Sequence, residues 1–337
     1  ALEEGHKPFE LDPFTLESKG AWNYKKKLDS AMTAHPKIDP ISGEMIGFSY
    51  GFGVNKLSYF VINRDGIMTT YREFETPYSS MMHDFIVTTK HIIFPIFPLI
   101  IDFNLVAQGK SPIAWDINRP SQIGIMPRDG SSQEIRWIED DPCFVFHPMN
   151  AYESEGKIIA DMMQFEEAPM FPHLDGSRPD LKKGEARLNR WEIDLASNSG
   201  SIRKQYLDDS IAEFPRLDER RSMSKHRHGY YASNNGKSPK GVSFNTISNY
   251  DFDTNRVMWK NNQTFDGHPT LKHHFDFVKE FFPQYINENA IEYYNQNKKI
   301  FTNSSQQDQE KVFNKYREDF FINKEIVLDN NHHITKR

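Results

Sequence analysis

Short stretches of apolar or alternating residues follow one another from the start of the chain to about Tyr250. Between them lie segments rich in Asp, Asn, Gly and Pro, which supply the backbone angles of tight turns. A strand and turn rhythm that repeats at roughly 8–15 residues is typical of β-sandwiches, barrels and propellers. The pattern predicts an all-β fold and does not by itself choose among these three. The strand-like runs cover residues 45–52, 57–64, 81–89, 91–99, 134–138, 143–148, 157–165 and 187–195.

The C-terminal quarter has a different pattern. After about Trp259, Asn, Gln and Lys become frequent while Gly and Pro become rare. Residues 275–301 and 307–321 carry apolar positions at the spacing of amphipathic helices. We therefore expect a β region over residues 1–258 and a divergent Asn/Lys-rich tail over residues 259–337, which is helical or partly disordered.

Bulk composition narrows the function classes. The chain has 337 residues, enough for one large domain with a substantial core. Its net charge of −6 is spread among interspersed acidic and basic residues, which argues against a nucleic-acid partner. The one cysteine, Cys143, excludes a disulfide framework within the chain, and its apolar flanks favour an inert buried thiol.

The sequence gives no sign of a membrane span. The apolar run over residues 91–102 contains two prolines and is shorter than the roughly 18 residues that a spanning helix needs. We expect a cytoplasmic protein, with at most peripheral contact between this run and a membrane surface. The chain opens on a segment typical of the interior of a domain, without Met or an apolar leader, so we expect it to be truncated.

Three histidines lie in or beside strand-like runs: His35 in TAHPKIDP, His83 in MMHDFIVT and His147 in FVFHPMNAYE. Imidazole is a ligand for iron, copper, nickel and zinc, and an all-imidazole set adds no negative charge to the ion. A single histidine on an apolar strand is nevertheless more often a hydrogen-bonded core residue. Separations of about 48 and 64 residues fit no local zinc motif. From these residues alone, both interpretations stay open.

Five blocks resemble, in order, those of the carotenoid cleavage oxygenase family. This family includes carotenoid, apocarotenoid and lignostilbene dioxygenases and the retinal-pigment isomerase. The resemblance covers about residues 1–258. The blocks are LDSAMTAHPKIDPISGEM, SSMMHDFIVTTKHIIFPIFPL, CFVFHPMNAYE, IAEFPRLDERR and HRHGYYAS.

The resemblance implies a seven-bladed β-propeller, which we expect to be incomplete at both ends of this chain. It also implies Fe(II) on the propeller axis, held by four histidines from four blades. His35, His83 and His147 match the first three ligand positions. Three glutamates would orient the ligand imidazoles by hydrogen bonds. They are Glu4, Glu153 and Glu213.

The fourth ligand should lie in a Gly-Phe-His-Gly-like block, and the chain has none. His268, the His273–His274 pair and the His332–His333 pair lack the expected flanking residues, so we name no fourth ligand. An active enzyme and an inactive chain therefore both remain open.

The implied activity is that of a non-haem Fe(II) dioxygenase that cleaves a C=C bond of a carotenoid-like or apocarotenoid-like polyene to two carbonyl products. The partners would be an apolar polyene or stilbene-like molecule and dioxygen, with no organic cofactor and no catalytic side chain beyond the metal site. Lignostilbene-type members tend to carry Lys before the first glutamate, where this chain has Glu3. This difference favours a polyene. Aromatic residues that could line a substrate tunnel are Phe52, Phe85, Phe94, Phe97, Phe146 and Phe171.

Three alternatives stay open. The first is a lignostilbene-type dioxygenase. The second is an inactive, propeller-derived binding protein that lacks the fourth histidine. The third is a hydrolytic three-histidine zinc site, for which Glu153 would be the one candidate base.

Overall fold

The computed structural model describes residues 1–129, 135–196, 201–234, 244–262, 326–328 and 334–336. Contacts divide the chain into two compact units, Ala1–Lys260 and Asn261–Arg337. The amphipathic segments 275–301 and 307–321 lie outside the described residues. In the second unit, the described part beyond residue 262 is a pair of strands, β21 (Ile326–Leu328) and β22 (Ile334–Lys336).

The described part of the first unit contains four sheets of four strands, and the strands of each sheet are arranged in chain order. The first sheet contains β3 (Lys37–Ile38), β4 (Met45–Tyr50), β5 (Lys56–Ile62) and β6 (Met68–Glu75). The second contains β7 (Ile86–Val87), β8 (His91–Ile96), β11 (Ser121–Pro127) and β12 (Arg136–Asp140). The third contains β13 (Phe144–Ser154), β14 (Lys157–Phe165), β15 (Arg187–Asp194) and β16 (Ile202–Tyr206). The fourth contains β17 (Ile211–Arg216), β18 (His228–Asn234), β19 (Thr246–Asp251) and β20 (Arg256–Asn262).

A tight turn joins β13 to β14 in the third sheet, whereas long connections join β8 to β11 and β14 to β15. The turn between β13 and β14 consists of Glu155 and Gly156, whose φ angles of 50° and 76° are both positive. Two positive φ angles define the type I′ turn, whose twist matches that of an antiparallel hairpin. The other described elements are two strand pairs and two short 3-10 helices. They are β1 (Phe9–Leu11) with β2 (Ser18–Ala21), β9 (Leu99–Ile101) with β10 (Ile113–Trp115), η1 (Phe103–Gln108) and η2 (Glu219–Arg221).

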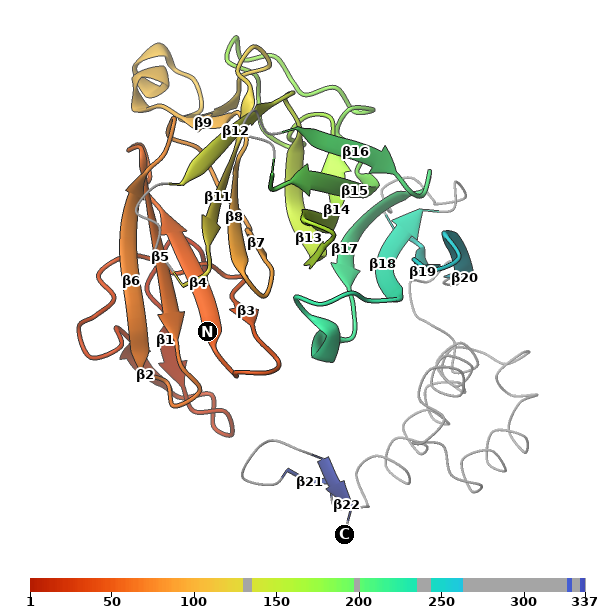
Figure 1. Ribbon diagram of the computed structural model, residues 1–337. Coiled ribbons are helices and arrows are strands. Elements are labelled where there is room, and N and C mark those ends of the chain that lie inside the picture. Colours follow the sequence, from red (N-terminus) through yellow and green to blue (C-terminus); the bar gives the residue numbers. More distant parts are fainter. Residues whose placement is uncertain (130–134, 197–200, 235–243, 263–325, 329–333, 337) are drawn as a thin grey trace, which may run out of the picture. The chain divides into compact units, whose positions relative to one another are not determined.

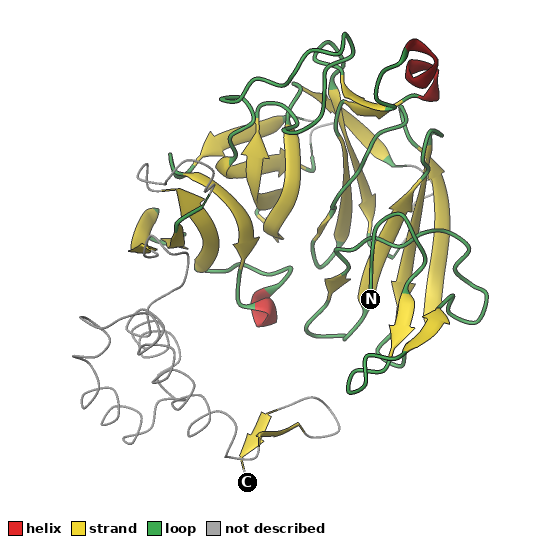
Figure 2. Cartoon of the chain, turned by 180° about the vertical axis from the view of Figure 1, so that it is seen from behind, coloured by secondary structure: helices red, strands yellow, loops and turns green. Residues whose placement is uncertain are grey.

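The first strands of the four sheets lie nearest to one another (Figures 1 and 2). β13 contacts both β7 and β17, and the Nε2 atoms of His35 and His83, which belong to the segments that lead into β3 and β7, lie 2.9 Å apart. Consecutive four-stranded meanders that surround a common centre are the blades of a β-propeller. The all-β prediction is confirmed, while the number of seven blades stays a prediction.

Apolar side chains fill the spaces between adjacent sheets. Phe48, Tyr59, Phe85 and Phe94 belong to one buried cluster, formed by the first and second sheets. A larger cluster involves the second, third and fourth sheets and includes the fully buried Trp191. This packing holds the sheets face to face and so fixes the positions of their inner strands. None of the helices in the described part of the chain is long and apolar enough to cross a membrane.

Candidate metal centre

The structure brings His35, His83 and His147 together at the inner edges of three sheets. His35 lies just before β3, His83 just before β7, and His147 within β13. Nε2 of His83 lies 2.9 Å from Nε2 of His35 and 3.2 Å from Nε2 of His147. The three candidate ligand atoms all lie within 4.8 Å of one another. A constellation that the sequence spreads over more than a hundred residues is therefore a single compact site.

Carboxylates orient two of the three rings. Nδ1 of His83 donates to Oε2 of Glu4 at 2.8 Å, and Nδ1 of His147 donates to Oε2 of Glu213 at 2.7 Å. A carboxylate can only accept, so each Nδ1 carries the proton. Each neutral ring then has its lone pair on Nε2, which faces the other imidazoles.

The donor set fits a metal ion. The Nε2 atoms of the three rings converge. When the rings are neutral, Nε2 of His83 and Nε2 of His147 carry no proton, so neither can donate a hydrogen bond to the other. Burial is the main cause that lowers the pKa of His35 to about 3, so this ring is neutral near pH 7. A cation at the centre would satisfy all three lone pairs. The pattern of a ligand imidazole that donates its other N–H to a carboxylate is common in protein metal sites.

Two bulges shape the inner strands at the centre. The register of β13 against β14 shifts around Pro148, next to His147. The register of β17 against β18 shifts between Glu213 and Arg216, and Phe214 inside this bulge has φ of 56°. A bulge places an extra residue on one strand and changes the direction of its side chains. These shifts allow His147 and Glu213 to face each other from neighbouring sheets.

Two phenylalanine rings contact the imidazoles. The Phe146 ring lies 5.2 Å from the His83 ring, measured between centroids, at an interplanar angle of 89°. The Phe214 ring lies 5.6 Å from the His147 ring and is 58% exposed. Of the predicted tunnel residues, Phe146 is therefore at the centre. Phe85, Phe94 and Phe97 are buried in the core, Phe52 is exposed beside Phe103, and Phe171 packs against the core.

The structure does not bring Glu153 to the three imidazoles. Its Oε1 accepts from Nδ1 of His91 at 2.8 Å and from the Thr88 hydroxyl at 2.6 Å. Glu153 lies near the far end of β13, six positions after His147. It therefore orients a histidine, as predicted, but a different one.

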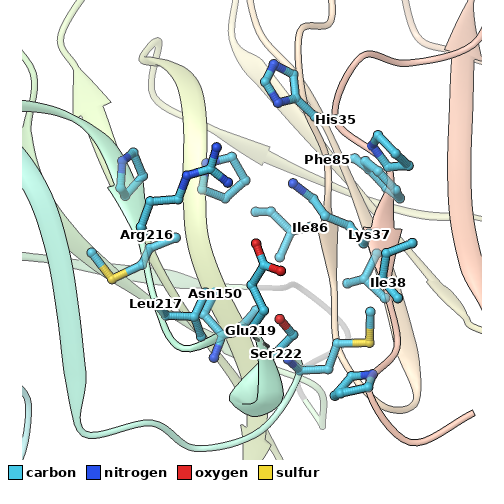
Figure 3. Close-up of a pocket in the computed structure, with 18 of the residues that line it drawn as sticks. His35, Lys37, Ile38, Phe85, Ile86, Asn150, Arg216, Leu217, Glu219 and Ser222 are labelled. Carbon is cyan, nitrogen blue, oxygen red and sulfur yellow. Dashed lines mark hydrogen bonds between the residues drawn. The ribbon is translucent and has the colours of Figure 1, made fainter. Parts of the chain in front are cut away.

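A cavity of about 430 Å³ lies beside His35 and is lined by segments 35–38, 85–87, 148–151 and 215–217 and by the loop that contains η2. Figure 3 shows Lys37 and Arg216 extending into it from opposite walls. The Lys37 ammonium contacts Asp84 Oδ1 at 2.7 Å. Burial raises the pKa of the Asp84 carboxyl, and the charge of Lys37 acts against this rise.

Sequence reasoning missed three features of this site. The Tyr50 hydroxyl donates to Oε1 of Glu4 at 3.1 Å, Phe214 covers His147, and Lys37 pairs with Asp84. Phe214 directly follows a predicted glutamate, and Lys37 and Asp84 lie within two residues of predicted ligands. Their positions beside predicted site residues were the available signal. The histidines considered for a fourth ligand, His268, His273–His274 and His332–His333, lie outside the described residues.

Comparisons with known proteins point to one family. The family model described as retinal pigment epithelial membrane protein matches residues 1–310. An isoeugenol monooxygenase from Pseudomonas putida is 38% identical over 245 residues, which cover 71% of this chain and 51% of the relative. Carotenoid cleavage oxygenase 1 from Neurospora crassa is 34% identical over 240 residues, which cover 68% of this chain and 46% of the relative.

A solved structure is also similar to this chain. The crystal structure of the lignostilbene dioxygenase from Pseudomonas brassicacearum matches with a TM-score of 0.71 and 31% identity, over 76% of this chain and 56% of that one. The chain thus spans about half the length of the curated relatives that it matches. With the family model matching most of its residues, the chain belongs to the retinal pigment epithelial membrane protein family, which is the family of the carotenoid cleavage oxygenases.

Proposed function

We propose that the protein of this chain is a non-haem Fe(II) oxygenase that cleaves a C=C bond of a conjugated small molecule with dioxygen and gives two carbonyl products. One observation carries the proposal: the Nε2 atoms of His35, His83 and His147 converge while Glu4 and Glu213 hold the Nδ1 protons of two rings. Neutral imidazole ligands leave the charge of the ion uncompensated, a donor set that suits iron as well as other divalent transition metals.

The iron would supply the binding and activation of dioxygen. The protein residues act by position. Glu4 and Glu213 fix the tautomers and ring orientations of His83 and His147, and Tyr50 holds Glu4 through its second oxygen.

Substrate would lie against the rings of Phe146 and Phe214. These two rings contact the candidate ligands. Phe214 is 58% exposed, so a substrate can reach its side chain. Flat aromatic surfaces suit an extended, conjugated hydrocarbon, because such a molecule gains contact area without needing charged partners. Isoeugenol, lignostilbene and carotenoid in the names of similar proteins all denote conjugated alkenes. Glu3 in place of a phenol-binding lysine favours the polyene within this class.

The test is metal analysis of anaerobically purified protein, together with oxygen uptake on an apocarotenoid, a hydroxystilbene and isoeugenol. We expect about one iron per chain and aldehyde products from at least one substrate. The His147→Ala variant should lose the iron, since it lacks one of three converging ligands. Full iron content in that variant, or zinc without oxygen uptake in the unmodified chain, would contradict the proposal.

The hydrolytic zinc alternative loses its candidate base, because the Glu153 carboxylate bonds His91 and Thr88 instead of facing the centre. The inactive binding protein stays the main competitor. It requires negligible iron and a melting temperature that a strong chelator leaves unchanged. As to location, we propose a cytoplasmic protein that meets membranes at most at their surface, which fractionation of cells into cytosol and membranes would test.

A further inference from the structure

The structure holds the backbones of the three candidate ligands to different degrees. His147 is part of β13, where ladder hydrogen bonds to β14 fix the backbone on both sides of the bulge. His35 and His83 precede the first residues of β3 and β7, so no strand pairing holds their own backbone. His35 also lacks a carboxylate partner on Nδ1 among the described residues, in contrast to His83 and His147. Backbone hydrogen bonds hold both segments two residues before each ligand, at Thr33 and at Met81, so a contact between the two segments can set the remaining distance.

An ion pair joins these two loops directly. The Lys37 ammonium lies 2.7 Å from Oδ1 of Asp84 and 2.9 Å from Oδ2. Lys37 is two residues after His35, and Asp84 is adjacent to His83. The Asp84 side chain is 3% exposed, and its Oδ1 also accepts from the backbone N–H of Phe85 at 2.7 Å. The acidic partner is therefore fixed to the start of β7, and the basic partner is fixed to β3.

General stability does not explain such a pair. Removing two charges from water costs about as much as their attraction returns, so buried ion pairs seldom add net stability. Their better-supported use is to select one geometry over others. Here the geometry concerns two ligand atoms, and metal sites tolerate errors of only about 0.5 Å in ligand position. Pro36 adds to the constraint, because the residue before a proline is restricted to extended backbone and His35 therefore has few alternatives.

We propose that Lys37 and Asp84 form a positioning pair that holds His35 and His83 at metal-binding distance. The two side chains act through the ligand loops and do not touch the ion. This inference rests on the proposed function, since it requires that the three histidines bind a metal. Glu4 and Glu213 orient the rings of His83 and His147. The ion pair would in a similar way restrict the position of His35.

The experiment compares Co²⁺ binding by four proteins: the unmodified chain, Lys37→Met, the double variant Lys37→Met with Asp84→Asn, and Lys37→Arg. Lys37→Met alone leaves the buried Asp84 carboxylate without its partner, which can prevent folding. The double variant leaves no unpaired buried charge, so it tests the positioning role even if the single variant does not fold. Affinity comes from competition with a chelator, and the visible absorption of bound Co²⁺ reports ligand geometry. Melting of the metal-free proteins measures the contribution to folding.

A matched control is the double variant Lys204→Met with Asp140→Asn. This pair is similarly shielded, with side-chain exposures of 19% and 15%, and its residues belong to the second and third sheets away from the three histidines. It measures what the loss of a partly buried ion pair does to the fold alone.

We expect the Lys37→Met, Asp84→Asn double variant to bind Co²⁺ about 10-fold to 100-fold more weakly, with an altered spectrum, while its metal-free melting changes no more than that of the control. Lys37→Arg keeps the charge and should restore both affinity and spectrum to near the unmodified values. Unchanged affinity and spectrum in the double variant would overturn the positioning role and leave the proposed metal centre intact. Failure of the unmodified chain to bind Co²⁺ would overturn both.

Discussion

Two kinds of histidine–glutamate pair occur in this molecule, and their local geometry is nearly the same. In His147–Glu213 the Nδ1 to carboxylate distance is 2.7 Å, and in His91–Glu153 it is 2.8 Å. Both pairs join neighbouring sheets. They differ in where the second ring nitrogen points: Nε2 of His147 faces Nε2 of His83, whereas His91 lies on β8 away from the cluster. A histidine bonded to a carboxylate is therefore not a metal ligand by itself, and convergence with other donors makes the difference.

The largest effect should separate the two glutamates. Glu213→Gln removes the charge that fixes the His147 tautomer, so we expect metal affinity to fall about 10-fold to 100-fold. Glu153→Gln should leave affinity unchanged, because its partner His91 is outside the cluster. Competition with a chelator measures the affinity of both variants. An equal loss of metal affinity in the two would show that Glu153 supports the metal centre as much as Glu213 does.

A smaller effect concerns stability at the peripheral pair. Glu153 accepts two hydrogen bonds that tie β13 to the β7–β8 connection. We expect Glu153→Gln to lower the free energy of unfolding by about 1 kcal/mol, which urea denaturation would measure. A loss of bound metal without a loss of stability would instead give Glu153 the role that the sequence resemblance suggested.

Tyr50→Phe tests the support behind Glu4. The variant removes one hydrogen bond to a carboxylate that keeps its bond to His83, so we expect metal affinity to fall only about twofold to threefold. Tyr71→Phe is a suitable control, because the Tyr71 hydroxyl bonds Ser58 in the first sheet. An identical change in both variants would show that Tyr50 has no specific role.

The smallest effect should come from the backbone at Phe214. A left-handed conformation costs an L-residue about 1 kcal/mol, and glycine avoids this cost but loses more entropy on folding. Phe214→Gly and Phe214→Ala both remove the ring that contacts His147, so a comparison of these two variants isolates the backbone. Because the strain and entropy contributions oppose each other, we expect the two variants to differ by less than about 0.5 kcal/mol in the free energy of unfolding measured in urea. An alanine variant that is more stable than the glycine variant by about 1 kcal/mol would show that the bulge is not strained.

Much of the fold could be predicted because its signals are local. The predicted runs at residues 157–165 and 187–195 correspond to β14 and β15, which neighbouring turn residues separate from the rest of the chain. The run at residues 81–89 was less accurate, because only Ile86–Val87 pairs as a strand. His83 thus lies in a loop, where the pattern of apolar residues predicted part of a strand.

The site could be predicted only in part, since it depends on contacts between sheets. The resemblance to the family's sequence blocks selected the three histidines that the structure brings together. Glu4 and Glu213, which it also selected, accept hydrogen bonds from two of them. It also selected Glu153, which bonds His91. Whether a glutamate faces one histidine or another depends on bulges and on how sheets pack, and no local pattern encodes that. For the same reason, the Lys37–Asp84 pair was invisible before the sheets were in place.

The anchoring of two Nδ1 protons has a consequence for the heat of metal loading. At a pH where all three imidazoles are neutral, the protons of His83 and His147 lie on Nδ1, so neither ring has a proton to release from Nε2 when an ion arrives. Burial keeps His35 neutral as well, because it lowers the pKa of this ring to about 3. Thiolate sites and protonated imidazole sites, by contrast, release protons to the buffer as they fill. At that pH, loading of this centre would be proton-neutral, and its calorimetric heat would be the same in buffers of very different ionisation enthalpy.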